Sequence, residues 1–399
     1  MKIGIIREEK TPADWRVTFS PKQCEKIVEI YPDIEIIVQT SNIRCFKDSE
    51  YEKSGFKVQE DISDCDILIG VKEVPINSLI PNKKYFFFSH TYKEQEYNRK
   101  LLKAIVKKEI ELYDYELLKN PSGLRVVFFG KWAGIVGAYN GIRTLGKKFR
   151  IFDLPKAASV DRKADVEELL KDVDLPNVKI LLTGKGHVAA GAREILEDAN
   201  VREVSKEEYL NLEFDYPVFV NLGCEDYAKA KDGRTFVQNE YFTKPQDFET
   251  SFLPFTAVTD MVITGHYWDH HAPRLWEVED MKSEDFKISI IADITCDIEG
   301  SVPSTLRPAT IDEPNYGYHP EFGEVEFMDD DAIAVMAVDN LPCELAKDAS
   351  ENFGAMFIKN VLPAFFNNDE EGILEGALMT KSGKLTEKYS YLQNFIDEA

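Results

Sequence analysis

Residues 178–196 read VKILLTGKGHVAAGAREIL, and this stretch decides the fold class of the chain. The apolar run at its start predicts a buried strand, and the residues after the glycines have helical spacing. Between the two, Gly184, Gly186 and Ala189 fit the pattern G-x-G-x-x-A. The first glycine makes a tight turn, the second lets backbone approach a pyrophosphate, and the third small residue lets helix pack on strand. The stretch therefore predicts a dinucleotide-binding unit within a parallel sheet.

The helix start would hold the cofactor phosphates through its free N–H groups, with His187 and Val188 in its first turn. The acidic residue that holds the ribose 2′-hydroxyl, expected about 20 positions further on, is missing. The second predicted strand ends instead at Ser205 and Lys206, which suit a 2′-phosphate better than two hydroxyls. Because three glutamates lie nearby, NAD and NADP both remain candidates, with a slight preference for NADP. A turn of this kind also occurs in units that bind no nucleotide.

Strands and helices alternate along much of the chain, which predicts parallel sheets covered on both faces. In the first third, strands are expected at 2–7, 34–39, 66–71, 85–88 and 110–115, and helices at 21–30 and 94–108. Further strands are expected at 201–204, 217–221, 258–264, 288–294 and 333–338, and the last sixty residues are expected to be mostly helical. A helix at 132–148 is rich in small residues, as expected of a helix that crosses between domains. The fold class is therefore α/β, with two Rossmann-like domains, parallel sheets and an interdomain cleft.

Charge is unevenly distributed along the 399 residues, whose net charge is -23. That acidity argues against nucleic-acid partners and anionic membrane surfaces. Residues 1–150 nevertheless carry 26 basic and 21 acidic side chains, against 22 and 50 in residues 151–399. The N-terminal part can therefore supply local positive charge to a small anionic ligand.

The sequence also bears on the compartment. No apolar stretch approaches the roughly 18–20 residues of a membrane span, and the N-terminus has no signal-peptide pattern. The six cysteines are widely spaced, without a CxxC pair, and predict free thiols in a reducing compartment. We therefore expect a cytoplasmic location.

Candidate catalytic residues follow two strands of the N-terminal part. Lys72 and His90 each come directly after an apolar strand, and ligands of open parallel sheets bind at the carboxyl ends of strands. Burial or a neighbouring cation lowers the pKa of a lysine, and histidine titrates near neutrality. Arg7, Arg16 and Arg125 suit bidentate carboxylate binding. The alternative for all five is ordinary surface charge or capping.

Eight motifs together resemble one family. In order they are IREEKTPADWRVTFSP, GVKEVP, FFFSHTYKEQ, DYELLKNPSGLRVVFFGKWAG, TGKGHVAAGA, HYWDHHAPRL, ADITCDIEGS and VDNLPCELAKDASENFG. They resemble the lysine-forming saccharopine dehydrogenases, and particularly the lysine–2-oxoglutarate reductase domain of the bifunctional enzyme, over about residues 1–362. The wider superfamily includes alanine dehydrogenase and transhydrogenase.

The resemblance implies the reversible conversion of saccharopine, NAD(P)+ and water to lysine, 2-oxoglutarate and NAD(P)H. It makes Lys72 the base for the secondary amine and His90 the acid–base catalyst of imine hydrolysis. Glu73 and Glu116 would tune the lysine. It further implies substrate binding by Arg7, Arg16, Tyr92 and Arg125, and cofactor binding by Asp293 and Asp297. Residues 1–133 with about 346–399 would form the substrate domain, and about 134–345 the dinucleotide-binding domain.

Several features depart from the family pattern or compete with it. Residues 225–256 are expected to be an insertion at the domain surface, and no glutamate-forming domain follows Ala399, which implies a stand-alone reductase. His266 and His270 would be four apart on a helix, but without a partner glutamate we expect no metal site. The competing functions are an alanine-type amino-acid dehydrogenase and a non-catalytic nucleotide-binding protein.

Overall fold

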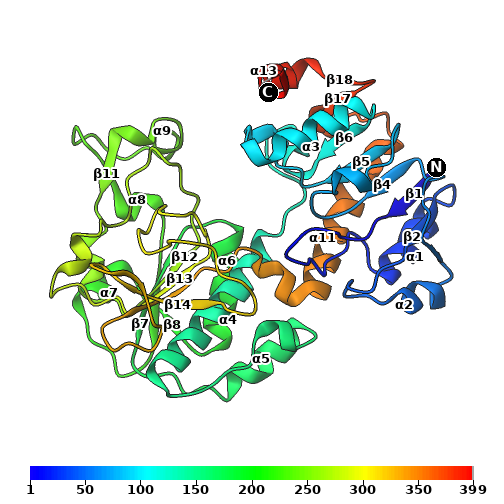
Figure 1. Cartoon of the computed structure of the whole chain (residues 1–399). Coiled ribbons are helices and arrows are strands. Elements are labelled where there is room, and N and C mark those ends of the chain that lie inside the picture. Colours follow the sequence, from blue (N-terminus) through cyan, green and yellow to red (C-terminus); the bar gives the residue numbers. More distant parts are fainter. Residues whose placement is uncertain (398–399) are drawn as a thin grey trace. The chain divides into compact units, whose positions relative to one another are not determined.

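The computed structural model describes residues 1–397, which form two compact units (Figure 1). The first unit comprises Met1–Phe129 and the C-terminal segment from Ala346, and the second comprises Gly130–Leu345. Each unit contains one eight-stranded, mostly parallel sheet, so the expected class of two Rossmann-like α/β domains is confirmed. Among the described residues, no helix has both the length and the apolar character of a membrane span.

The sheet of the first unit has the strand order β18-β17-β6-β5-β4-β1-β2-β3. Its parallel strands are β1 (Lys2–Ile5), β2 (Glu35–Gln39), β3 (Lys57–Gln59), β4 (Ile67–Ile69), β5 (Lys84–Phe87) and β6 (Glu111–Asp114). Two strands from the C-terminal segment, β17 (Leu378–Lys381) and β18 (Lys384–Leu385), extend it in antiparallel pairing. Because the strands β1, β4, β5 and β6 are parallel, their carboxyl ends lie along one edge of the sheet.

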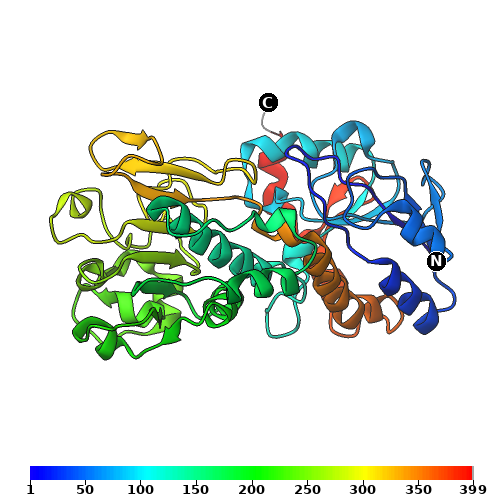
Figure 2. The ribbon, with the colours of Figure 1, turned by 90° about the horizontal axis from the view of Figure 1, so that it is seen from below.

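The helices of this unit are α1 (Pro21–Ile30), α2 (Asp48–Lys53), α3 (Glu96–Lys107), α11 (Ala346–Asn360), α12 (Ile373–Ala377) and α13 (Gln393–Asp397). Short 3-10 turns are η1 (Ile76–Ser78), η2 (Thr91–Lys93), η3 (Tyr115–Leu117), η8 (Leu362–Phe365) and η9 (Glu387–Leu392). Helix α1 begins where the sequence predicts, because Ser20 and Gln23 form a capping box and a proline occupies the first turn. Figure 2 shows α11 beside α1, and the Gln23 amide donates to the Glu351 carbonyl across this contact (2.6 Å).

Helix α11 closes the core of the first unit with aromatic side chains. Phe353 stacks on Phe129 with ring centroids 4.6 Å apart and meets Tyr115 edge-on at 5.0 Å. Phe357 makes edge contacts with Phe19 (5.4 Å) and with strand β5. Aromatic pairs of this kind add to the hydrophobic energy of burial. The C-terminal segment is therefore part of the N-terminal core.

The sheet of the second unit has the strand order β15-β14-β16-β13-β12-β7-β9-β8. Its parallel strands are β7 (Lys179–Thr183), β8 (Arg202–Glu203), β9 (Val218–Leu222), β12 (Met261–Thr264), β13 (Ile290–Asp293) and β16 (Ile333–Met336). The hairpin of β14 (Asn315–His319) and β15 (Gly323–Val325), which the periodicity did not predict, adds an antiparallel edge. The neighbour of β7 on this side is β9, and β8 lies outside it.

The helices of the second unit are α4 (Gly130–Phe149), α5 (Lys163–Lys171), α6 (His187–Asp198), α7 (Lys206–Asn211), α8 (Cys224–Tyr227), α9 (Gln238–Thr243) and α10 (Leu253–Thr256). Its 3-10 turns are η4 (Ala157–Ser159), η5 (Pro245–Asp247), η6 (Asp280–Lys282) and η7 (Leu341–Leu345). The small residues of α4 serve packing within this unit. A Cβ on Gly134 would lie 1.8 Å from the Val188 carbonyl, and one on Gly191 would lie 2.0 Å from that of Lys131. The sequence predicted that this helix crosses between domains, but α4 lies wholly in the second unit and packs closely on α6.

The segment 225–256 contributes to the core as well as to the surface. Strands β10 (Ala228–Ala230) and β11 (Phe248–Thr250) form a separate antiparallel pair. Phe248, Phe252 and Phe255 are nevertheless buried in the hydrophobic core of the second unit. This segment is therefore not a surface insertion alone. All six cysteines are free, as the sequence predicts.

Candidate active site

The ends of strands β4 and β5 bring two predicted catalytic residues into one cluster. These strands pair in parallel, so the residues after them run side by side. Glu73 follows β4 and His90 follows β5, and the Glu73 Oε1 lies 2.7 Å from the His90 Nδ1. Lys10 reaches the other carboxylate oxygen of Glu73 at 2.9 Å. Burial alone would raise the pKa of Glu73, but the hydrogen bonds from His90 and Lys10 lower it to about 2.

Lys72 precedes Glu73 and is held through its backbone. The buried Glu8 carboxylate, just beyond β1, accepts hydrogen bonds from the N–H groups of Val71 (2.7 Å) and Lys72 (2.8 Å). Burial and the nearby carboxylate of Asp14 raise the pKa of Glu8 to about 8. Sequence reasoning missed Glu8. The available signal was its place after β1, which neighbours β4 in the sheet.

The Lys72 side chain lies in an electropositive setting. Burial, followed by the charges of Arg16 and Lys10, lowers its pKa from the usual value of a lysine. Among the residues that the structure describes, the Lys72 ammonium forms no ion pair. A lysine of lowered pKa without a fixed counter-ion can exchange a proton with a ligand.

Arg16, which was predicted to bind substrate, makes close contacts with other residues of the protein. Its guanidinium donates to both oxygens of Asp14, at 3.0 and 2.6 Å, and lies 4.3 Å from the centre of the Phe129 ring. Both members of this pair are almost fully buried. Bidentate pairing fixes the guanidinium rigidly. Arg16 therefore acts on the site chiefly as a fixed positive charge facing Lys72.

A second buried carboxylate holds the backbone of His90. Asp114, the last residue of β6, accepts hydrogen bonds from the N–H groups of Ser89 (2.8 Å), His90 (3.0 Å) and Glu116 (2.8 Å). It also accepts from the Ser89 hydroxyl at 2.6 Å. His90 has the left-handed φ of 54°, an uncommon conformation for a non-glycine residue. Asp114, which the sequence did not single out, therefore maintains a strained backbone at the site.

Glu116, Arg125 and Tyr92 meet at the end of β6, as a third part of the cluster. The Glu116 carboxylate pairs with Arg125 (2.8 Å) and Lys93 (3.0 Å) and is hydrogen-bonded to the Tyr92 hydroxyl. Burial opposes ionisation, but the charges of Arg125 and Lys93 hold the pKa of Glu116 below its ordinary value. Burial, together with the Glu116 charge, raises the pKa of Tyr92. Both cations are partly exposed, so they remain accessible to an anionic ligand.

Arg7 does not join this cluster. Its guanidinium pairs with Glu9 (3.3 Å) and with Glu60 (2.7 Å), which follows the edge strand β3. Among the described residues, no hydrogen bond or ion pair links Arg7 to Glu73, His90 or Glu116. The substrate-binding role that the resemblance implies for Arg7 therefore has no support from these contacts.

The glycine turn predicted from the sequence lies directly after β7. Gly184 has φ +92°, and a Cβ there would lie 2.5 Å from the Gly265 carbonyl. A Cβ on Gly186 would meet nothing within 4 Å. Helix α6 begins at His187, and the buried Ala189 lets it approach the sheet. The space beside Gly186 at the start of this helix is therefore open, and helix N-termini in general offer free N–H groups to phosphates.

Most of the other predicted cofactor residues have partners within the second unit. Ser205 and Lys206 follow the edge strand β8, where Ser205 caps α7 and Lys206 pairs with Asp226 at 2.8 Å. Asp293 is completely buried and accepts hydrogen bonds from the hydroxyls of Thr264, Thr295 and Thr305. Asp297 is exposed beyond β13. Asp293 thus acts as an internal anchor for the loop after β13.

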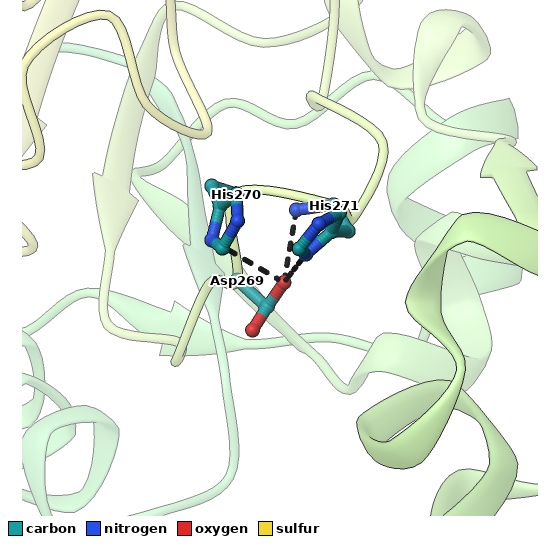
Figure 3. A group of neighbouring side chains, drawn as sticks. All are labelled: Asp269, His270 and His271. Atoms are coloured by element: carbon teal, nitrogen blue, oxygen red, sulfur yellow. Dashed lines mark hydrogen bonds and ion pairs between the residues drawn. The ribbon is translucent and has the colours of Figure 1, made fainter.

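The histidine-rich segment after β12 is not helical, so the expected i, i+4 pair of His266 and His270 does not exist. His266 is buried, with its Nδ1 2.6 Å from the Thr183 hydroxyl. Asp269, His270 and His271 instead form an exposed group of possible metal ligands (Figure 3). The Asp269 carboxylate accepts the His271 N–H at 2.9 Å, and both imidazoles are more than half exposed. These contacts are those of a turn, and within residues 1–397 no hydrogen bond from outside this group holds the His270 or His271 ring, of the kind that is usual for metal-binding histidines.

Comparison with known proteins shows relatives along the whole chain. Residues 4–136 match the family model "Alanine dehydrogenase/PNT, N-terminal domain". The chain is 28% identical over 442 residues to alpha-aminoadipic semialdehyde synthase of Arabidopsis thaliana, covering 98% of this chain and 41% of that protein. It therefore spans less than half the length of this relative. It is 24% identical over 377 residues to saccharopine dehydrogenase [NAD(+), L-lysine-forming] of Yarrowia lipolytica, covering 90% of each.

A solved structure agrees with the fold. An L-alanine dehydrogenase superposes with a TM-score of 0.68 at 16% identity, covering 99% of this chain and 100% of that one. The chain is thus similar to lysine-forming saccharopine dehydrogenases and alpha-aminoadipic semialdehyde synthases, and its residues 4–136 match the model of the alanine dehydrogenase/PNT N-terminal domain.

Proposed function

We propose that this protein is an NAD(P)-dependent oxidoreductase of the lysine-forming saccharopine dehydrogenase type. It would interconvert saccharopine, NAD(P)+ and water with lysine, 2-oxoglutarate and NAD(P)H. The observation that carries the proposal is the cluster at the ends of β4, β5 and β6, where Lys72, Glu73 and His90 stand beside Glu116 and Arg125. The names of both curated relatives support an amino-acid substrate of this class.

Lys72 suits the role of base for the secondary amine. The amine nitrogen of saccharopine must lose its proton before the neighbouring carbon can give up hydride. The lowered pKa of Lys72, caused by burial and then by Arg16 and Lys10, increases the fraction of neutral amine available to accept that proton. Glu8 holds the Lys72 backbone, so the amine is presented from a fixed position.

His90 suits the hydrolytic half of the reaction. A carboxylate can only accept a hydrogen bond, so the proton between His90 and Glu73 resides on Nδ1. Nε2 is then the nitrogen that exchanges protons as water adds to the imine and the carbinolamine collapses. Arg125, Lys93 and Tyr92 lie close by and would bind a substrate carboxylate.

The cofactor fits the second unit, at the turn of Gly184 and Gly186. A nicotinamide dinucleotide supplies the hydride acceptor in this class of reaction. The open space at Gly186 and the start of α6 would receive its pyrophosphate, while the packing of Gly184 against Gly265 keeps the turn in shape. The sequence-based preference for NADP rested on Ser205 and Lys206, and both side chains have partners within the protein.

The decisive experiment follows the absorbance of reduced nicotinamide with lysine and 2-oxoglutarate, using NADH and NADPH in separate reactions. We expect oxidation that requires both substrates. No oxidation with either nucleotide would overturn the proposal. The alanine-type alternative predicts reduction of NAD by L-alanine instead, and a non-catalytic protein would bind nucleotide without turnover.

A further inference from the structure

The strand order of the second unit changes which residues stand beside the ribose of the cofactor. In a dinucleotide-binding sheet, the residue that holds the adenine ribose comes from the end of the strand next to the first one. Here the first strand is β7, and its neighbour is β9, which pairs with it from Lys179 to Thr183. The position that the sequence pattern assigned to the end of β8 therefore belongs to the residues after β9. This step rests on the proposed binding of a dinucleotide at Gly184 and Gly186.

An acidic residue stands at that position. Glu225 follows β9, and its Oε1 accepts a hydrogen bond from the Lys185 ammonium at 2.7 Å. Lys185 is the residue between the two glycines of the turn. A Cβ on Gly223 would lie 2.3 Å from the Glu225 Oε2, so the carboxylate lies directly over the chain leaving β9. The Glu225 side chain is 45% exposed, which leaves it accessible to a ligand.

The turn itself is tied to β9. The Asn221 side-chain amide donates to the Gly184 carbonyl at 2.7 Å and to that of Leu182 at 3.2 Å. The end of β9 and the glycine turn are thereby held in register. The hydrogen bond from Lys185 lowers the pKa of Glu225, so the carboxylate is ionised at neutral pH. A charged acceptor thus stands next to the turn on a rigid support.

The neighbouring cation offers little to a 2′-phosphate. Asp226 accepts the Gly223 N–H at 3.0 Å and pairs with Lys206 at 2.8 Å. The positive charge of Lys206 is therefore already matched within the protein. The Ser205 hydroxyl donates to the Glu208 carboxylate at 2.8 Å. Among the described residues at the end of β9, Lys206 and Lys185 already pair with Asp226 and Glu225, so the charge of a 2′-phosphate would not be balanced by these two cations.

We propose that Glu225 binds the hydroxyls of the adenine ribose and thereby selects NAD(H) over NADP(H). A carboxylate accepts hydrogen bonds from two vicinal hydroxyls, whereas it repels a phosphate ester at the 2′ position. The slight sequence-based preference for NADP is accordingly replaced by a preference for NAD.

The test measures nucleotide binding directly, by the fluorescence of NADH and of NADPH titrated onto the full-length protein. We expect the unmodified protein to bind NADH at least about 10-fold more tightly than NADPH, because hydrogen bonds to a charged group contribute about 10- to 100-fold in affinity. Glu225→Gln and Glu225→Ser should weaken NADH binding and tighten NADPH binding, so that the preference falls about 10-fold or more. Glu207→Gln, which removes an exposed charge from the neighbouring α7, is the matched control and should leave the preference unchanged.

The outcomes separate this inference from the proposed reaction. Tighter binding of NADPH by the unmodified protein, or an unchanged preference in both Glu225 variants, would overturn the inference alone. Tighter binding of NADH without oxidation by lysine and 2-oxoglutarate would overturn the proposed reaction and leave the inference standing. Binding of neither nucleotide would overturn both.

Discussion

Asp114 supports the strongest prediction about the candidate site, because one carboxylate satisfies three backbone donors. Its oxygens accept from the N–H groups of Ser89, His90 and Glu116. Asp114→Ala removes all three acceptors, while the Ser89 hydroxyl retains Thr91 as a partner at 2.8 Å. An unsatisfied buried donor costs about 1–3 kcal/mol, so the free energy of unfolding should fall by about 3–9 kcal/mol.

Asp114→Asn is the informative companion, because complete truncation removes much of the roughly 5–15 kcal/mol that stabilises a domain. Asparagine keeps one acceptor oxygen and loses the other, so a cost of about 1–3 kcal/mol is expected. Turnover should fall further than this stability loss explains, because His90 is then free to leave its left-handed conformation. Substrate KM should change less than kcat.

Hydrogen exchange under increasing urea is the suitable assay, since it reports the first unit separately from the second. Peptides containing residues 84–93 should lose protection in both variants. Asp61→Ala is the matched control, because Asp61 also accepts a backbone N–H, that of Ser63 at 2.8 Å, but at the surface. Its unfolding midpoint should stay unchanged. A cost below about 1 kcal/mol for Asp114→Ala, with normal turnover, would refute the assigned role of Asp114.

The remaining predictions concern both units. Lys72→Met should lower kcat by about 10²- to 10⁴-fold while nucleotide affinity changes little. The control is Lys84→Met, at the amino end of β5, whose kcat should match that of the unmodified protein. Equal rates for the two variants would remove Lys72 from the mechanism. Gly184→Ala should destabilise the fold, since its Cβ would lie 2.5 Å from the Gly265 carbonyl. Gly186→Val should keep the melting temperature of the unmodified protein but abolish nucleotide binding, because its side chain would fill open space. Unimpaired nucleotide binding by Gly186→Val would place the cofactor elsewhere. Burial lowers the pKa of His266 to about 4, below its unfolded value near 6.5. Protonation of His266 therefore lowers the stability of the second unit by roughly 3 kcal/mol, and this loss develops as the pH falls from about 6.5 toward 4. Hydrogen exchange at stepped pH should show the loss in the unmodified protein and not in His266→Gln.

Local patterns predicted the secondary structure closely. The strand, glycine turn and helix around Gly184 lie where the sequence indicates, because hydrophobic periodicity and turn chemistry act within a few residues. The helix at 21–30 has its predicted bounds for the same reason, since its cap and first-turn proline are adjacent in sequence. The basic N-terminal part likewise contains Lys72 and His90 after the expected strands.

Side-chain partners could not be predicted in the same way. Glu8 and Asp114 serve Lys72 and His90 only because β1 neighbours β4 and β6 neighbours β5. Arg7 ends a predicted strand but pairs with Glu60, which follows a strand found only in the structure. Which strand ends face each other depends on sheet order, and periodicity within one strand carries no information about its neighbours.

The sequence by itself determined the class of fold, the glycine turn and the identity of the residues at several strand ends. Only the tertiary structure decided that β9 rather than β8 lies beside β7, so that the residues after β9, Glu225 among them, lie next to the glycine turn. The physical reason is the range of the interactions. Helices, turns and strands arise from contacts within a few residues, whereas strand order and the partners of buried charges arise from contacts between residues far apart in the chain.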